Sequence, residues 1–303
     1  MVDITKKTNS LRIAIASALL TVSREETMLA INDNAVPKGN VFEFSRAAGL
    51  LAIKKTSDVI PDCHPLPIEF ASITHSMEGL QIRVTVEVHT IYKTGVEVEA
   101  MHGAAITALT MYDMLKPIDK GIEISQVKLE NKSGGKSQFP IEKTATLTCV
   151  VVVCSDTVFQ NKKEDSSGKL ISEKLSDLGL SVEKVEIIAD EHETIQQRAL
   201  HYSDAGVDLL LFVGGTGLSY RDVTPDAIRT LLTREIPGVM ETARAYGQQR
   251  MPYAMLSRGV CGFIKDTLVL TLPGSPKGSL ETVDAVFPHI LHVFKVAAGE
   301  RHQ

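Results

Sequence analysis

Hydrophobic and polar residues follow one rhythm before about residue 140 and a different one after it. In the first part, runs of apolar, β-type residues predict strands over 11–22, 68–75, 80–91 and 122–129, with a turn at 77–79. Apolar residues at helical spacing predict helices over 24–33, 39–57 and 96–115, the last ended by Pro117. Strands joined mainly by hairpins, with helices on one face, indicate an α+β domain, which we expect to be ferredoxin-like.

The second part alternates continuous apolar runs with helical stretches. Strands are predicted over 145–154, 181–189, 207–213 and 259–272, and helices over 167–178, 192–204, 224–233, 238–250 and from 278 onwards. This alternation is typical of an α/β domain with a mostly parallel sheet flanked by helices. The polar, glycine-containing stretch 131–140 is the best boundary, so we expect domains at 1–138 and 139–303.

Composition excludes several classes of protein. The 303 residues include 32 Lys and Arg against 37 Asp and Glu, a net charge of −5, which argues against a general binder of nucleic acid or anionic membranes. No apolar run is long enough to span a membrane, and the apolar stretch 11–22 fits a strand better than a signal peptide. Four cysteines without a CxxC pair are expected to be reduced thiols of a cytoplasmic protein without a tightly bound structural metal.

The predicted helix 96–116 carries Glu99, Asp113 and Lys116 on one broad face, and Asp113 and Lys116 are i,i+3 neighbours. One interpretation is a solvated stripe with a single weak ion pair. The other is an anion pocket, because lysines gather near turns and helix ends of the same domain, at positions 38, 54, 55, 132 and 136. Glu99 and Asp113 stand about 21 Å apart along a straight helix. Either the ligand is elongated or the pocket joins two subunits.

Four segments in this order, at 61–66, 93–100, 108–116 and 133–137, resemble cyclic pyranopterin monophosphate synthase of molybdenum cofactor biosynthesis. The resemblance covers about residues 1–138 and implies the conversion of a cyclised dihydroguanosine 5′-triphosphate to cyclic pyranopterin monophosphate and pyrophosphate. It also implies a homo-oligomer, in this family a hexamer.

The resemblance assigns roles residue by residue. The catalytic group it implies consists of Asp113, Lys116, Lys54 and Lys38. The substrate-binding positions it implies are Cys63, His64, Val98 and Glu99, with Asp62 beside them. Asp62 replaces the usual Leu and Val98 the usual Met, and since neither change removes an ionisable group we expect activity to survive.

The motif Gly214-Gly215-Thr216-Gly217 lies between an apolar strand and a helix, where backbone N–H groups can face a phosphate. It is not a P-loop, and by itself it fits a tight turn equally well. Aspartates follow the neighbouring predicted strands, and parallel strands end at one edge of a sheet. These are Asp156, Asp165, Asp190 and Asp222. Carboxylates beside a phosphate loop imply a bridging Mg²⁺, whereas Thr224 is expected to be a helix cap.

These motifs, together with 236–238 and 272–276, resemble the molybdopterin adenylyltransferase family over about residues 145–300. The resemblance implies transfer of an adenylyl group from Mg-ATP to molybdopterin. Asp190 and Asp222 match its two required aspartates and are the expected Mg²⁺ ligands, and Thr216 lies in the nucleotide loop. Ser275, a further expected binding residue, stands where related enzymes often carry Gln.

The sequence therefore predicts a fusion of two enzymes whose partners are small molecules: the cyclised GTP derivative, molybdopterin and ATP. One alternative keeps the synthase and makes the second domain a non-catalytic pterin-binding or oligomerising module. Another is a scaffold or sensor in which neither domain turns over.

Overall fold

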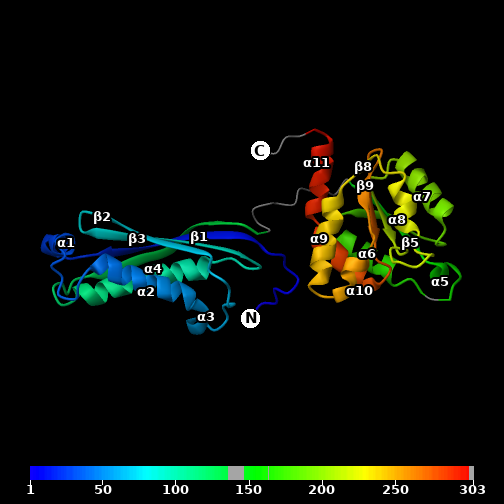
Figure 1. The fold of residues 1–303 in the computed structure, drawn as a ribbon. Coiled ribbons are helices and arrows are strands. Elements are labelled where there is room, and N and C mark those ends of the chain that lie inside the picture. The colour runs from blue at the N-terminus through cyan, green and yellow to red at the C-terminus, as the bar shows by residue number, and fades with distance from the viewer. Residues whose placement is uncertain (136–146, 163, 300–303) are drawn as a thin grey trace. The chain divides into compact units, whose positions relative to one another are not determined.

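The computed structural model describes residues 1–135, 147–162 and 164–299. The chain divides into two compact units, Met1–Pro140 and Ile141–Gln303 (Figure 1). The predicted boundary between residues 138 and 139 lies outside the described residues. Within the described part of the chain, none of the helices combines the length and the hydropathy that crossing a membrane requires.

The N-terminal unit is an antiparallel sheet with helices on one face, as the α+β prediction expects (Figure 1). Its strands, in the sheet order β2-β3-β1-β4, are β1 Ser10–Thr21, β2 Phe70–Glu78, β3 Gln81–Tyr92 and β4 Glu123–Ser133. Its helices are α1 Glu25–Asn32, α2 Val41–Lys54, α3 Thr56–Val59 and α4 Glu97–Leu115. The β2–β3 turn falls later than predicted, because Met77 and Glu78 pair with Ile82 and Gln81.

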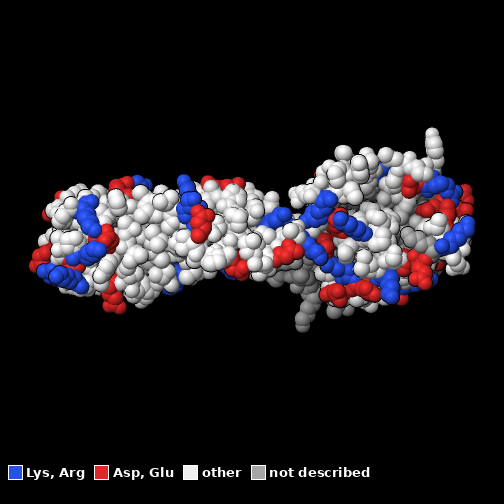
Figure 2. Space-filling model, turned by 90° about the horizontal axis from the view of Figure 1, so that it is seen from below, with Lys and Arg blue, Asp and Glu red and all other residues white. Residues whose placement is uncertain are grey.

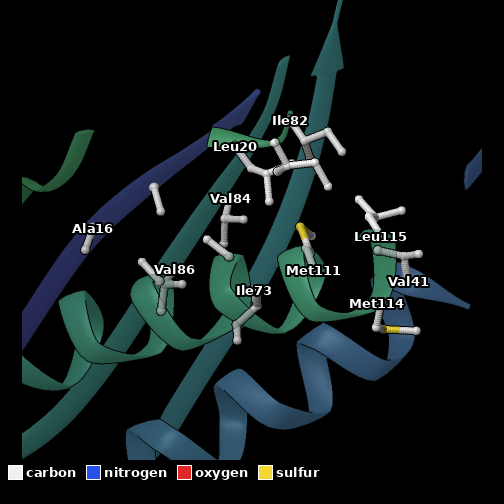
Figure 3. Close-up of a cluster of buried hydrophobic side chains, with 14 of the residues drawn as sticks. Ala16, Leu20, Val41, Ile73, Ile82, Val84, Val86, Met111, Met114 and Leu115 are labelled. Carbon is white, nitrogen blue, oxygen red and sulfur yellow. The ribbon is translucent and has the colours of Figure 1, made fainter. Parts of the chain in front are cut away.

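The core of this unit lies between the sheet and α4. Alternate residues of β1 and β3, among them Leu20 and Val84, point towards Met111 and Leu115 of α4 (Figure 3). Small side chains line the rest of this contact at four-residue spacing on α4 and two-residue spacing on β1, and all are fully buried: Ala100, Ala104 and Ala108, and Ala14, Ala16 and Ala18. The helix therefore lies close to the strand along its whole length.

Helix α2 lies antiparallel against α4 and approaches it closely through two glycines. A Cβ atom on Gly49 would collide with Thr107 and stand 3.2 Å from the carbonyl oxygen of Gly103. Further along, Ile53 packs on Gly103, and Thr56 Oγ1 is 3.1 Å from His102 Nδ1. The residues before α2 are thus at the C-terminal end of α4, and the residues that end α2 are at its N-terminal end.

The C-terminal unit is a six-stranded sheet in the order β6-β5-β7-β10-β9-β8. Its strands are β5 Thr148–Cys154, β6 Ser181–Ile188, β7 Leu209–Val213, β8 Arg234–Glu235, β9 Cys261–Ile264 and β10 Thr267–Leu272. The first four in the sheet are parallel, and β9 is antiparallel to both of its neighbours, β10 and β8, so the prediction of a mostly parallel sheet is confirmed. The sheet is mixed because residues 261–272 form a hairpin.

Helices cover both faces of this sheet (Figure 1). They are α5 Asp156–Phe159, α6 Ser167–Asp177, α7 His192–Asp204, α8 Thr224–Arg229, α9 Pro237–Gln248, α10 Pro276–Val286 and α11 Val293–Ala297, with 3₁₀ turns η1 Pro252–Leu256 and η2 His289–His292. Along β5, Val151 and Val153 pack with α6, α9 and α10, whereas Val150 and Val152 pack with α7 and α8. This two-sided burial explains the continuous apolar runs of the sequence.

The α2–α4 contact predicts that Gly49→Ala destabilises the protein although alanine is the better helix former. The extra methyl group overlaps Thr107, and relief of such an overlap costs about 1–3 kcal/mol. Denaturant unfolding followed by circular dichroism measures this loss. Gly238→Ala in α9 is the matched control, since apart from α9 itself no described part of the chain lies within 4 Å of its added Cβ, and its stability should equal or exceed that of the wild type. Equal stabilities of the Gly49→Ala variant and the wild type would contradict the packing.

Candidate functional site

At the C-terminal end of α4, one carboxylate holds two lysines. Asp113 Oδ2 lies 2.6 Å from Lys38 Nζ, and Asp113 Oδ1 lies 2.7 Å from Lys116 Nζ. Lys38 Nζ also donates to the backbone carbonyl of Asp113 at 2.9 Å. Hydrogen bonds from Lys116 and then Lys38 lower the pKa of Asp113 to about 2, and Asp113 in turn raises the pKa of Lys116. The three charges sum to +1 on an exposed surface, which suits a phosphate group.

At the N-terminal end of α4, Glu99 is buried, with only 3% of its surface exposed. Cys63 Sγ donates to Glu99 Oε1 at 3.3 Å, and Oε2 has no hydrogen-bond partner among the described residues. Burial raises the pKa of Glu99, and burial together with the neighbouring Glu99 raises the pKa of Cys63 to about 11. The interpretation of a solvated stripe is therefore wrong for Glu99, because Cys63 packs on it.

The other predicted substrate-binding residues lie around this second group. Asp62 Oδ1 is 2.6 Å from the amino nitrogen of Met1, and His64 Nε2 is 2.8 Å from the carbonyl oxygen of Val2. Val98 is 43% exposed. Lys54 ends α2 at the same end of α4 and is exposed.

The predicted synthase residues thus form two groups at opposite ends of one helix rather than one pocket. Asp113, Lys38 and Lys116 make up the first group, and Glu99 and Cys63 the second. The expected cluster of lysines does not form among the described residues, since Lys55 pairs with Asp58 at 2.9 Å and Lys132 with Glu97 at 3.3 Å. Lys136, the remaining expected member, lies outside those residues. The antiparallel course of α2 is the reason. Figure 2 shows charged side chains towards both ends of this unit, with a largely uncharged stretch between them.

In the C-terminal unit, the loop after β7 presents backbone N–H groups. Gly214 and Gly215 have φ angles of 115° and 61°, which favour glycine, and a Cβ on Gly214 would collide with the carbonyl oxygen of Cys154. Gly214 N donates to the carbonyl oxygen of Leu272 at 3.0 Å. The next three amides, of Gly215, Thr216 and Gly217, have no acceptor within residues 1–135, 147–162 and 164–299. They are donors available to an anion.

Carboxylates converge on this loop from the neighbouring strand ends, as the sequence predicts. Asp190 N donates to Asp156 Oδ1 at 3.0 Å, and Asp190 Oδ1 is buried without a partner among the described residues, beside Gly215. Burial first, and then the charge of Asp156, raises the pKa of Asp190 to about 6. Asp222 lies against Gly217, and its Oδ2 accepts from Ser219 N at 2.8 Å. The sequence did not single out Arg221, which pairs with Asp156 and lowers its pKa.

These oxygen atoms fit the chemistry of Mg²⁺. A hard cation takes carboxylate oxygens, and the unpartnered Oδ1 of Asp190 is one that the protein leaves available. No group of three or more His, Cys, Asp or Glu side chains surrounds a common point in the described part of the chain. In proteins Mg²⁺ commonly uses one or two carboxylates together with substrate phosphates.

Ser275 and Thr224 each lie near the start of a helix, but only Ser275 caps its helix. Ser275 is the N-cap of α10, where its Oγ accepts from Gly278 N at 3.2 Å, and it lines a cavity of about 230 Å³ with Pro273. Thr224 is not a helix cap, so that prediction is wrong. Helix α8 begins at Thr224 itself, the cap position is Val223, and Thr224 Oγ1 is buried without a partner among the described residues.

Two family models match the chain, one in each unit. The model described as the MoaC family covers residues 1–135, and that of a probable molybdopterin binding domain covers residues 150–292. A molybdenum cofactor biosynthesis bifunctional protein of Chlorobaculum tepidum is 35% identical over 302 residues, which span 100% of this chain and 96% of that protein. This chain belongs to the family of bifunctional molybdenum cofactor biosynthesis proteins.

Shorter proteins match this family member as well. A cyclic pyranopterin monophosphate synthase of Listeria monocytogenes is 45% identical over 138 residues, 45% of this chain and 86% of that protein. The crystal structure of the molybdopterin biosynthesis enzyme MoaB from Thermus thermophilus is 38% identical with a TM-score of 0.49, covering 52% of this chain and 100% of that chain. The predicted family is confirmed by the two family models and the full-length relative.

The raised pKa of Asp190 predicts that Asp190→Asn stabilises the ligand-free protein at pH 7. The folded state binds this proton more tightly than the unfolded state, so stability falls as the pH rises from the ordinary value of 3.8 to about 6. Asparagine cannot ionise, and the variant should therefore melt higher at pH 7 but equally at pH 4. A gain of about 1 kcal/mol corresponds to roughly 2–4 °C in a domain of this size.

Thermal melts between pH 4 and pH 8 measure this difference. Asp266→Asn, in the exposed turn between β9 and β10, is the control and should follow the wild-type pH profile. If the melting temperatures of Asp190→Asn and the wild type changed in parallel with pH, the pKa of Asp190 would not be raised in the folded protein.

Proposed function

We propose that the chain carries two activities of molybdenum cofactor biosynthesis. The N-terminal unit converts a cyclised dihydroguanosine 5′-triphosphate to cyclic pyranopterin monophosphate and pyrophosphate. The C-terminal unit transfers an adenylyl group from Mg-ATP to molybdopterin. The observation that supports both is a candidate anion site in each unit. One consists of two lysines held by Asp113, and the other of three loop amides that have no acceptor among the described residues, the first of them next to Asp190.

In the synthase, the ammonium groups of Lys38 and Lys116 bind the triphosphate and the departing pyrophosphate, where negative charge gathers. Asp113 remains ionised because of its low pKa and keeps both lysines in position. Glu99 and Cys63, whose raised pKa values favour protonated forms, are suited to hold or exchange protons at the base of the substrate. Lys54 is a further cation at that end.

The separation of these two groups supports a site shared between chains. Fourteen residues of helix span about 21 Å, more than one small reacting centre can bridge. Large apolar side chains are exposed on the helices between the two groups: Phe44 and Leu51 on α2, and Leu109 on α4. Exposed apolar side chains of this size are suited to contact with another copy of the chain. We therefore propose a homo-oligomer, a hexamer by family resemblance, in which α4 of one chain brings its C-terminal end to the N-terminal end of its partner's α4.

In the transferase, the amides of Gly215, Thr216 and Gly217 bind phosphate oxygens of ATP. Asp190 and Asp222 would hold Mg²⁺, which when bound neutralises phosphate charge. The terminal phosphate of molybdopterin attacks the α-phosphorus of ATP in line, and pyrophosphate leaves. Ser275, in the cavity that Pro273 also lines, is placed to contact the second substrate. The alternative, a non-catalytic pterin-binding module, needs no ionisable Asp190.

The proposal also covers the fold type of the N-terminal unit, the location of the protein and its partners. The N-terminal unit has three helices between β1 and β2 and one helix between β3 and β4, and its sheet order is β4-β1-β3-β2, which supports the ferredoxin-like type. The four cysteines are unpaired thiols, which supports a cytoplasmic location. The partners are the small-molecule substrates and further copies of the chain, with no nucleic acid or membrane.

Lys116→Ala should lower kcat/KM of the synthase by about two orders of magnitude or more, because one of the two charges on the phosphates is lost. Formation of cyclic pyranopterin monophosphate from the cyclised triphosphate measures this change. Lys120→Ala, an exposed lysine four residues further on, is the control and should keep wild-type activity. Unchanged turnover in Lys116→Ala would contradict the role proposed for Asp113, Lys38 and Lys116.

Incubation of the wild-type protein with molybdopterin and Mg-ATP should release pyrophosphate and form adenylylated molybdopterin. Asp190→Asn should abolish this reaction and leave the synthase unaffected, whereas Lys116→Ala should do the reverse, because the two sites belong to separate units. Chromatography of both products in the same samples gives this comparison. Absence of pyrophosphate and of the adenylylated product with wild-type protein would favour the non-catalytic alternative.

A further inference from the structure

Arg258, which the sequence did not single out, reaches from the segment between η1 and β9 to the loop after β7. Its Nε donates to the carbonyl oxygen of Gly217 at 2.8 Å, and its Nη2 donates to the carbonyl oxygen of Asp222. Its backbone N–H donates to the carbonyl oxygen of Thr216 at 3.0 Å. Arg258 therefore contacts the loop at both ends, beside the amides of Gly215–Gly217 and at the aspartate proposed for Mg²⁺.

The guanidinium group is itself fixed from a third side. Its Nη1 lies 3.1 and 2.9 Å from Oδ1 and Oδ2 of Asp226, in the first turn of α8. A guanidinium group is planar, so contacts in three directions fix the relative positions of Gly217, Asp222 and Asp226. A lysine ammonium, as a single point charge, cannot make the same set of contacts at once.

Hydrophobic packing does little to hold this loop. Leu218 is 67% exposed and Tyr220 is fully exposed. The hydrogen bonds of Ser219 with Asp222 and Arg221 lie within the loop. The ion pair of Arg221 with Asp156 is a further polar attachment of this loop to the rest of the unit. The position of the segment 216–222 thus depends on its polar contacts, and Arg258 makes three of them.

We propose that Arg258 is a positioning residue that holds the amides of Gly215–Gly217 and the backbone of Asp222 in the arrangement that binds the phosphates of a nucleotide. The part of this inference that concerns the nucleotide rests on the adenylylation proposed above. Arg258 acts through the loop rather than by contact with substrate, since its guanidinium group is engaged with two backbone carbonyls and a carboxylate of the protein.

Arg258→Lys tests this role in the full-length protein by two readouts. The first is amide hydrogen exchange of segment 215–222 without ligand, which should become about tenfold faster or more because local opening is easier. The second is the Kd of Mg-ATP by calorimetry, which should rise about tenfold at unchanged stoichiometry, with the melting temperature within roughly 3 °C of the wild type.

Arg229→Lys is the matched control, because Arg229 lies in the same unit and pairs with Glu235 at 3.5 Å. It should keep wild-type exchange and affinity. Asp226→Asn provides a second variant should Arg258→Lys fold poorly, since it weakens the third contact of the guanidinium group without changing Arg258. It should accelerate exchange of the same segment, to a smaller extent.

The outcomes separate this inference from the proposed reaction. Wild-type exchange of segment 215–222 in Arg258→Lys, or in Asp226→Asn when that variant replaces it, overturns the positioning role. A lower stoichiometry with an unchanged Kd also overturns it, because that result describes loss of folded protein. Wild-type protein that binds no Mg-ATP refutes the adenylylation proposal, while hydrogen exchange still decides whether Arg258 holds the loop.

Discussion

Helix α4 imposes the constraint on which the N-terminal site depends. It is a continuous helix of 19 residues, fully packed against the sheet through its alanines and against α2 through Gly103. A helix packed on both sides cannot bend to bring its ends together. Glu99 in its first turn and Asp113 near its last turn therefore stay about 21 Å apart. Whatever reacts in this unit meets one end of α4 in a given chain, or spans both.

In the C-terminal unit, by contrast, the fold brings the residues of the proposed site together within one chain. Its parallel strands end at one edge of the sheet, so residues distant in sequence become neighbours within a single chain. Asp156 follows β5, Asp190 follows β6 and the glycine loop follows β7, and these groups lie in contact. In the sites proposed above, anion binding rests on backbone amides in this unit and on lysines in the first. A net acidic chain can thus carry two phosphate sites without a basic surface.

Much of this organisation could be predicted from sequence because it is local or periodic. The helices and strands follow the spacing of apolar residues, and the convergence of aspartates at the sheet edge follows from parallel topology. The position of the lysines could not be predicted in this way. It depends on the antiparallel course of α2, which is set by the contact of Gly49 with α4.

Two other features could not be predicted from the sequence either. Glu99 is buried and in contact with Cys63, a residue 36 positions away. Arg258 contacts the loop after β7 across 41 positions, and no motif marks it. Contacts of this kind have no periodic signature, so only the folded chain reveals them.

Mixing two inactive variants tests most directly whether α4 forces the synthase site to be shared between chains. Glu99→Gln removes a residue at one end of the helix and Lys116→Ala one at the other, and each variant alone should have little activity. Co-expression places both in one oligomer, where a site shared by two chains can receive Glu99 from one and Lys116 from the other. Random pairing in a symmetric dimer then restores about a quarter of wild-type synthase activity. No recovery in confirmed mixed oligomers would contradict the shared site.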